Sequence, residues 1–222
     1  MVRRDLVRHM PRHWIFDLDN TLYPPAVGIA TQCNARIVLF LQQLYGIEPV
    51  AARHKQRELI ARHGTTLRGV MSSMGVDPAE FLAFEEDLDY SGLQPDAALR
   101  DALLDLPGQR IVFTNGSVSY ATRLIQLLDL TEAVDGMWGI DSADFTPKPW
   151  EEAYRQCFDR YDVEASDAVF FDDLARNLEV PKRLGMHTVW VAPDEAEQQA
   201  PLHVDVVASD VLSGLKRLTM EP

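Results

Sequence analysis

The sequence is short of the residues and motifs that mark several common protein classes. Its 222 residues include only two cysteines, Cys33 and Cys157, and neither belongs to a Cys-x-x-Cys motif. Two isolated cysteines favour buried, reduced thiols over a disulfide. No stretch reaches the roughly 18 apolar residues that a membrane-spanning helix requires, and no apolar segment of the kind found in signal peptides follows the arginines of residues 1–13. We therefore expect a cytoplasmic protein without a membrane partner.

Lysine is also scarce, because four lysines stand against seventeen arginines. Acidic residues outnumber both together, 34 to 21, which gives a formal net charge of −13. Proteins bind DNA and RNA by neutralising phosphates with basic side chains, so this charge argues against a nucleic acid partner. A small anion stays compatible with it where local cations focus the field. A lysine within a motif is therefore worth notice.

The catalytic motifs of several hydrolase classes are missing. His9 and His13 have His-x-x-x-His spacing, but none of the six histidines belongs to a His-Glu-x-x-His motif, and the chain has no Gly-x-Ser-x-Gly motif and no glycine-rich phosphate loop. These absences argue against histidine-based chemistry. Carboxylates become the first candidates for a reactive group.

The apolar pattern predicts an α/β fold. Helical patterns alternate with strand-like apolar runs, which lie at residues 14–16, 110–113, 137–140, 168–171, 188–191 and 204–207. Such alternation predicts a parallel sheet covered by helices on both faces. The length and the 46% of hydrophobic residues fit one domain, or a domain with an inserted unit.

One section of the chain breaks this alternation. Residues 24–94 show helical patterns only, with a polar loop bounded by glycines at residues 63–69. Breaks rich in proline flank the section on both sides. The sequence therefore predicts a core formed by residues 1–23 and 95–222, with an all-helical unit inserted after the first strand and able to move as a unit.

The end of the first predicted strand carries two carboxylates. Asp17 and Asp19 follow it directly, and because side chains two residues apart in a strand point to the same side, we expect them to lie together. Two like charges held this close are costly unless a cation joins them or one keeps a proton. An acidic turn without a function would show the same spacing, so this pair alone does not decide the matter.

Two further strand ends carry polar groups, and in open α/β sheets ligands bind outside the carboxyl ends of the strands. Thr114-Asn115-Gly116 follows the second strand and opens a helix, where free amide groups and the helix dipole favour an anion. Ordinary turns and helix caps use the same residues. Asp172 and Asp173 follow the strand of residues 168–171.

Together the four aspartates form a set of hard oxygen ligands that suits Mg²⁺. Lys148 lies between two prolines that stiffen the backbone before a helix. This setting suits a fixed cation aimed at the same pocket, although a surface lysine in a proline-rich turn would look the same. A nucleophile, a metal, an acid/base group and charge stabilisation are the parts that phosphoryl transfer needs.

These motifs resemble those of the haloacid dehalogenase superfamily of phosphohydrolases, in the same order and over nearly the whole chain. The four matching motifs are Asp17-Leu18-Asp19-Asn20-Thr21, Thr114-Asn115-Gly116, Lys148, and Asp172-Asp173 with Asn177. The resemblance implies a Rossmann-like parallel sheet, with the helical insertion acting as a cap that closes over the substrate.

The resemblance also implies roles for the matching residues. Asp17 would be the nucleophile and Asp19 the acid/base. The residues that bind the phosphate of the substrate would be Thr114, Asn115, Gly116 and Lys148. The Mg²⁺ ligands would be Asp17, the backbone carbonyl of Asp19, and Asp173, with Asp172 supporting the metal from outside its direct ligands.

A narrower resemblance leads to the pyrimidine 5′-nucleotidases. It lies in residues 17–24, in the loop of residues 64–69 and in residues 90–96. It implies hydrolysis of small nucleoside monophosphates similar to UMP or CMP. Thr66 and Arg68 of the polar loop can offer hydrogen-bond donors to the base or the ribose, although a helix-capping Thr66 and a solvated Arg68 would look the same in the sequence. Many relatives carry aspartate at the position of Asn177, which leaves the fine metal geometry open.

Other functions stay open. A phosphosugar phosphatase, a phosphoglycolate phosphatase or a phosphomutase of the same superfamily would differ only in the cap. A 2-haloacid dehalogenase would share the fold and the nucleophile, but those enzymes lack the second carboxylate, so Asp19 argues against it. A non-catalytic binding module would have to retain buried like charges without a metal. The natural substrate and the oligomeric state do not follow from the sequence.

Overall fold

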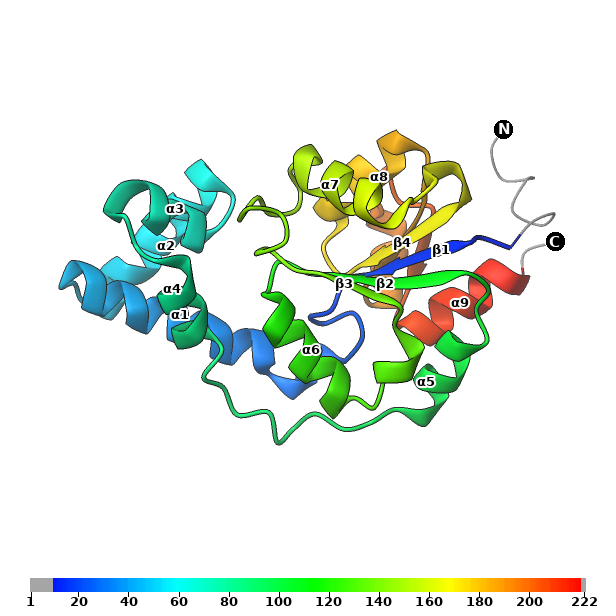
Figure 1. Cartoon of the computed structure of the whole chain (residues 1–222), viewed down its shortest axis with the longest axis horizontal. Coiled ribbons are helices and arrows are strands. Elements are labelled where there is room, and N and C mark those ends of the chain that lie inside the picture. Colours follow the sequence, from blue (N-terminus) through cyan, green and yellow to red (C-terminus); the bar gives the residue numbers. More distant parts are fainter. Residues whose placement is uncertain (1–9, 221–222) are drawn as a thin grey trace.

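The computed structural model describes residues 10–220, which fold around a parallel sheet (Figure 1). Its strand order is β3-β2-β1-β4-β5-β6, and every neighbouring pair is parallel. The strands are β1 (His13–Phe16), β2 (Gln109–Phe113), β3 (Gly136–Trp138), β4 (Ala168–Asp172), β5 (His187–Val191) and β6 (Val206–Ala208). The predicted α/β fold is confirmed, and the two shortest strands lie at the edges of the sheet.

Helices cover both faces of the sheet, as the apolar strands require. Trp14 and Phe16 of β1 point into one apolar cluster, and Ile15 points into the other. The first cluster is covered by α5 (Ala97–Leu104), α6 (Val118–Leu127) and α9 (Val211–Met220), and the second by α7 (Glu151–Tyr161) and α8 (Glu179–Leu184). Short 3-10 helices lie at η2 (Pro25–Val27), η3 (Thr131–Ala133), η4 (Ala165–Asp167), η5 (Ala175–Leu178) and η6 (Asp194–Gln199).

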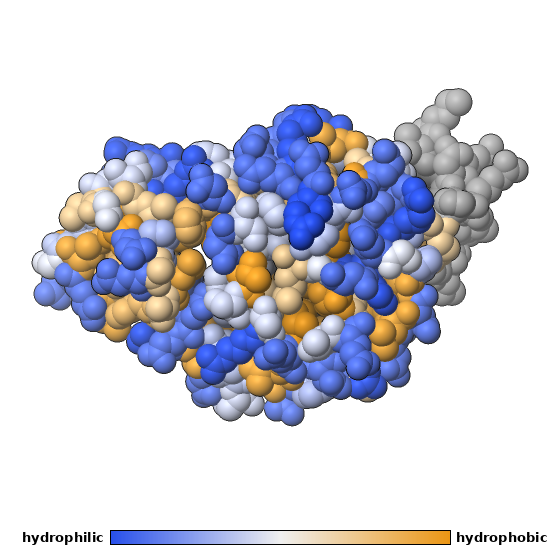
Figure 2. Space-filling model, in the orientation of Figure 1, coloured by the Kyte–Doolittle hydropathy of each residue, from blue (hydrophilic) through white to orange (hydrophobic). Residues whose placement is uncertain are grey.

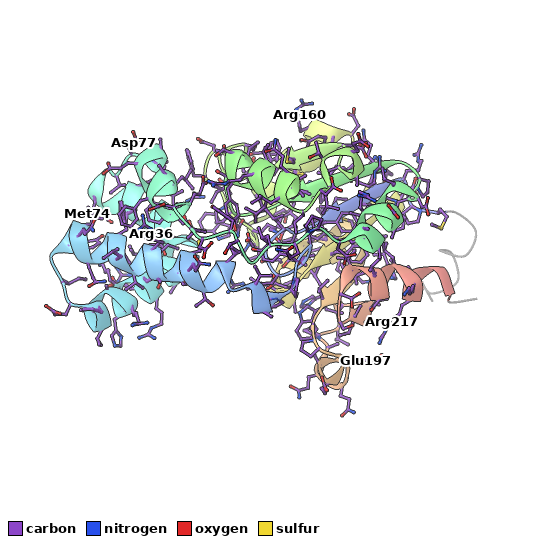
Figure 3. All side chains as sticks on the ribbon, turned by 90° about the horizontal axis from the view of Figure 1, so that it is seen from below. Arg36, Met74, Asp77, Arg160, Glu197 and Arg217 are labelled. Atoms are coloured by element: carbon purple, nitrogen blue, oxygen red, sulfur yellow. The ribbon has the colours of Figure 1, made fainter. Side chains whose placement is uncertain are left out.

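Four helices form a separate helical unit beyond the carboxyl ends of the strands (Figure 1). They are α1 (Ile29–Tyr45), α2 (Pro49–His63), α3 (Thr66–Met74) and α4 (Pro78–Glu85). The unit has an apolar core of its own, which includes Phe40, Leu41, Leu59, Val70 and Phe81. Met74 and Asp77 mark its end remote from the sheet (Figure 3). That residues 24–94 move as a cap against residues 1–23 and 95–222 stays a prediction.

The prediction of a polar loop at residues 63–69 is wrong for most of these residues. Only Gly64 and Thr65 lie outside helices, because α3 begins at Thr66. Thr65 is the N-cap of α3, and its hydroxyl oxygen accepts a hydrogen bond from the amide of Arg68 at 3.2 Å. Polar residues that suggest a loop therefore start a helix here, as N-cap threonines commonly do.

The surface and the thiols agree with most of the sequence predictions. Hydrophilic residues cover most of the face shown in Figure 2. Within the described residues, no helix is long and apolar enough to cross a membrane, and most of the arginine-rich start, residues 1–9, lies outside them. Both cysteines are free thiols, but only Cys157 is buried, whereas Cys33 is half-buried.

Gly69 shows why α3 can pack closely against α2. Inside a helix, glycine ordinarily costs about 1 kcal/mol relative to alanine. A Cβ at this position would lie 2.7 Å from Cδ2 and 2.8 Å from Cβ of Leu59. The glycine is therefore a packing residue of the helical unit.

We expect Gly69→Ala to lower the free energy of unfolding by about 1–3 kcal/mol, because overpacking outweighs the gain in helix propensity. Ser72→Ala is the matched control, since Ser72 is exposed in the same helix and should change the stability by no more than about 0.5 kcal/mol. Urea unfolding measures both variants. A Gly69→Ala protein that is more stable than the wild type would contradict the close packing of α2 and α3.

Candidate active site

The carboxyl ends of β1 and β4 bring three of the predicted aspartates together. Asp17 directly follows β1, Asp172 ends β4, and the amide of Asp17 donates to the carbonyl of Phe171 at 2.8 Å. One carboxylate oxygen from each of Asp17, Asp172 and Asp173 lies within 4.8 Å of the other two. The cluster that the strand ends predict is present, and the role of each residue stays a prediction.

Lys148 lies inside this cluster, with its side chain only 1% exposed. Its ammonium donates to Oδ1 of Asp17 at 2.7 Å, to Oδ2 of Asp172 at 2.8 Å and to the carbonyl oxygen of Phe113 at 2.8 Å. An ammonium has three donors, so all of them are in use. A phosphate bound nearby would therefore interact with Lys148 as a charge unless one of these hydrogen bonds is exchanged.

Asn115 fixes the backbone that carries Lys148. Its side-chain oxygen accepts from the amide of Lys148 at 2.8 Å, and its side-chain amide donates to the carbonyl of the same residue at 3.2 Å. This double hydrogen bond joins the turn after β2 to the proline-rich turn of residues 146–149. The side chain of Asn115, predicted to bind phosphate, thus already positions the lysine.

Burial and mutual repulsion control the protonation of the cluster. Burial raises the pKa of Asp17, the Lys148 ammonium opposes this rise, and the charge of Asp172 adds to it. Burial also raises the pKa of Asp173 to about 6. For Lys148, burial favours the neutral amine, but the charges of Asp17 and Asp172 outweigh it and raise the pKa. Lys148 therefore stays charged at neutral pH.

The cluster fits a hard divalent cation. Its donors are carboxylate oxygens, which Mg²⁺ prefers, and three carboxylates around one ammonium leave negative charge to balance. Both oxygens of Asp172 accept short hydrogen bonds, from Lys148 and from the side-chain amide of Asn177 at 2.9 and 3.1 Å. Oδ2 of Asp17 accepts only a long one, from Thr21 at 3.4 Å, and Asp173 accepts only one, from Asn20 at 3.3 Å. This arrangement suits Asp17 and Asp173 as direct ligands, with Asp172 holding its neighbours in place.

Asp19 lies apart from the cluster and is held by two phenols. The hydroxyl of Tyr120 donates to Oδ1 of Asp19 at 2.6 Å, and the hydroxyl of Tyr23 donates to the same oxygen. Burial raises the pKa of Asp19, and the hydrogen bonds from Tyr120 and Tyr23 oppose this rise. Sequence reasoning missed both tyrosines, although Tyr23 stands four residues after Asp19 in the same motif.

The turn after β2 is less open to an anion than the sequence suggests. Thr114 is buried, and its hydroxyl oxygen accepts from the amide of Gly116 at 2.9 Å. The helix begins only at Val118, whose amide donates to Oδ1 of Asp141 at 3.0 Å. The amides of Gly116 and Val118 therefore already donate to acceptors within the protein. The prediction of free amides for an anion is wrong for these two.

Two adjoining cavities separate the cluster from the helical unit. The first, of about 210 Å³, is lined by Asp19 and Tyr120 on the sheet side and by Cys33, Glu85 and Glu86 on the other. The second, of about 200 Å³, has Thr66 and Arg176 on opposite sides. The residues common to both are Asn34, Leu82, Glu85 and Asn115. Sequence reasoning missed Arg176 and both glutamates, because no motif marks them.

The two residues predicted to select the substrate are placed differently. Thr66 lines the second cavity. Arg68 lines neither cavity; its guanidinium donates to the hydroxyl of Thr146 at 3.2 Å and lies 4.1 Å from the centre of the Trp150 ring. Arg68 thus joins α3 to the turn that carries Lys148.

Known proteins share this architecture. A phosphatase of the haloacid dehalogenase (HAD) type from Thermococcus onnurineus is 19% identical, with a TM-score of 0.65 over 95% of this chain and 99% of its own. The magnesium-bound putative HAD-hydrolase YfnB from Bacillus subtilis is 14% identical, with a TM-score of 0.64 over 96% and 100%. An L-2-haloacid dehalogenase from Xanthobacter autotrophicus is 18% identical, with a TM-score of 0.59 over 94% and 98%.

At these identities the structural likeness shows the fold alone, and it includes both phosphatases and dehalogenases. A match of the amino-acid sequence to a family model identifies the family. Residues 11–185, most of the chain, match the family model of the haloacid dehalogenase-like hydrolases. The protein therefore belongs to the haloacid dehalogenase-like hydrolase family.

Proposed function

We propose that this hydrolase is a Mg²⁺-dependent phosphatase of small phosphate monoesters. The observation that carries the proposal is the pairing of Asp17, held by Lys148, with a second buried carboxylate, Asp19, two residues further along. Asp19 lines a cavity, and Asp17 is buried two residues before it at the end of β1. A nucleophile with an acid close by is what hydrolysis through a covalent intermediate needs.

In the proposed reaction, an oxygen of Asp17 attacks the phosphorus, and the bond from phosphorus to the leaving oxygen breaks. Asp19 gives its proton to that oxygen, so that an alcohol departs. Asp19 then takes a proton from a water whose oxygen attacks the aspartyl-phosphate, which releases phosphate and restores both carboxyl groups. Asp17, Asp173 and the carbonyl of Asp19 would hold Mg²⁺, which would supply positive charge for the phosphoryl oxygens.

Asp19 favours a phosphate ester over a 2-haloacid as substrate. A halide leaves as a stable anion, whereas the alkoxide of an ester needs a proton when it leaves. The opposing effects of burial and of the two phenols on the pKa of Asp19 suit a group that must both give and take a proton. Dehalogenation needs no acid for its leaving group, although hydrolysis of its ester intermediate still needs a base for the water.

As the narrower proposal, the ester is a pyrimidine nucleoside monophosphate similar to UMP or CMP. Two adjoining cavities beside Asp19 give room for a leaving group larger than a short alcohol. Thr66 and Arg176 both line the second cavity, and their side chains carry groups that could hydrogen bond a ribose or a base. A site built on such bonds rejects analogues that lack the matching groups.

We expect Asp17→Asn to reduce phosphate release by about 10⁴-fold or more, because it keeps the shape of the side chain but removes the nucleophile. Phosphate release from p-nitrophenyl phosphate and from UMP with Mg²⁺ measures the loss, and chelation of the metal should abolish turnover in the wild type. Asp159→Asn, an exposed substitution on α7, is the control. An Asp17→Asn enzyme that keeps a tenth of wild-type turnover would refute the assignment.

Asp19→Asn should slow both chemical steps, because the leaving alcohol loses its acid and the water loses its base. Turnover of UMP should fall by about 10²–10⁴-fold. The first step with p-nitrophenyl phosphate should fall less, because its leaving group needs no proton. Steady-state and single-turnover rates with both esters separate the steps. If neither ester is slowed appreciably, Asp19 does not have this role.

Thr66→Val should lower kcat/KM for UMP and CMP by about tenfold more than for p-nitrophenyl phosphate, because it removes one hydrogen-bonding group from the second cavity. Arg68→Ala is the contrasting variant. It should affect all three esters alike, because Arg68 contacts the turn of residues 146–150 and not the cavity. An equal response of all esters to Thr66→Val would count against nucleotide selection at this position.

A further inference from the structure

The cavity beside Asp19 has an acidic wall. Asp19, Glu85 and Glu86 all line this space of about 210 Å³, and its lining within the described residues includes no lysine, arginine or histidine. Under the proposed function Asp19 protonates the leaving oxygen, so this wall faces the alcohol part of the substrate. The acidic wall is thus part of the candidate active site and not a separate acidic patch.

Neither glutamate of the acidic wall is in a salt bridge within the part of the chain that the structure describes. Oε1 of Glu85 accepts a hydrogen bond from the thiol of Cys33 at 2.8 Å. Oε1 of Glu86 accepts from the hydroxyl of Ser117, which also caps α6. Both partners are neutral donors, so no salt bridge among the described residues balances either glutamate when it is ionised.

The nearest arginines are engaged elsewhere. Arg36 of α1 (Figure 3) pairs with Asp87 at 3.0 Å. The guanidinium of Arg123 lies 4.4 Å from the centre of the Tyr90 ring, near enough to lower the pKa of Glu86 although burial raises it overall. Neither arginine lines the cavity. Arg176 shares the second cavity with Glu85 but does not line the cavity of the acidic wall, so a ligand in that cavity could bring a positive charge that its lining does not contain.

The position of the glutamates in α4 makes them costly. Glu85 is the last residue of the helix and Glu86 is its C-cap. The C-terminus of a helix carries partial negative charge, so acidic residues there are unfavourable. Burial adds to this cost and raises the pKa of Glu85 to about 7. Packing alone would be served as well by glutamine or by an apolar side chain.

We propose that the acidic wall binds an amino group, so that the substrates are phosphate monoesters of alcohols that carry an amine. The inference rests on the proposed phosphatase function, and it departs from the nucleotide proposal, because uridine and cytidine carry no ammonium at neutral pH. An ammonium would donate charge-assisted hydrogen bonds to Glu85 and Glu86. A leaving group with a carboxylate, as in phosphoglycolate or another hydroxy acid ester, would be repelled.

Three esters of similar chain length test the proposal: 3-aminopropyl phosphate, butyl phosphate and 3-carboxypropyl phosphate. We expect kcat/KM for the amino ester to exceed that for the butyl ester by about tenfold or more, since hydrogen bonds between charged groups have this magnitude. The carboxypropyl ester should be the poorest substrate. The ratio of two esters on one enzyme does not depend on how much of a variant is folded.

Glu85→Gln keeps the shape of the side chain and removes its charge, so it should lower the amino-to-butyl ratio by about tenfold. The matched control is Glu80→Gln, an exposed glutamate in the same helix that does not line the cavity, and it should leave the ratio unchanged. An equal loss in both variants would show a long-range effect of charge and would overturn the proposal.

p-Nitrophenyl phosphate separates failure of this inference from failure of the proposed function. If it is hydrolysed in a reaction that needs Asp17, while the carboxypropyl ester is turned over as well as the amino ester, the phosphatase stands and the amine site is refuted. If neither the four esters nor UMP is hydrolysed, the phosphatase assignment falls and the amine site falls with it.

Discussion

The Lys148 ammonium is the positive charge around which the carboxyl edge of the sheet is arranged. It donates to Asp17 after β1, to Asp172 at the end of β4 and to the carbonyl of Phe113 at the end of β2. Removing one partner of a buried ion pair leaves an uncompensated charge at a cost of about 3–5 kcal/mol. These residues therefore depend on one another, and Asn115, which holds the backbone of Lys148 at two atoms, belongs to the same network.

The two parts of the molecule divide the chemistry between them. The sheet supplies the groups that any phosphate ester would meet, because they follow strands whose ends meet at one edge. The helical unit supplies Glu85, Glu86 and Thr66, which face the cavities where a leaving group would lie. Arg68 joins α3 to the turn that carries Lys148. A shift of the helical unit would therefore strain this hydrogen bond and could displace the turn.

The sequence predicts the parts of this molecule that depend on local rules. Parallel strands bring their carboxyl ends together, so the strand pattern alone is enough to group Asp17, Asp172 and Asp173. Tyr120 cannot be found in this way, because its hydrogen bond to Asp19 depends on how α6 packs beside the first strand. The positions of Glu85 and Glu86 depend on how α4 packs against the rest of the protein, and the apolar pattern of the sequence does not predict this packing. The start of α3 escapes prediction for a different reason, since a threonine N-cap and a loop threonine look alike.

The distribution of charge gives the candidate site a direction. The chain is strongly acidic, with a net charge of −13, so a phosphate ester gains little from the protein as a whole. The local field must supply the attraction. Lys148, together with a divalent metal where the aspartates hold one, would balance the three carboxylates of the cluster, whereas Glu85 and Glu86 line the cavity beside Asp19 with uncompensated carboxylates. An ester with an anionic phosphate and a cationic leaving group would align with this field, and the reversed orientation would oppose it at both ends. The charges of the site would therefore favour one orientation of the substrate even where no contact depends on the shape of the leaving group.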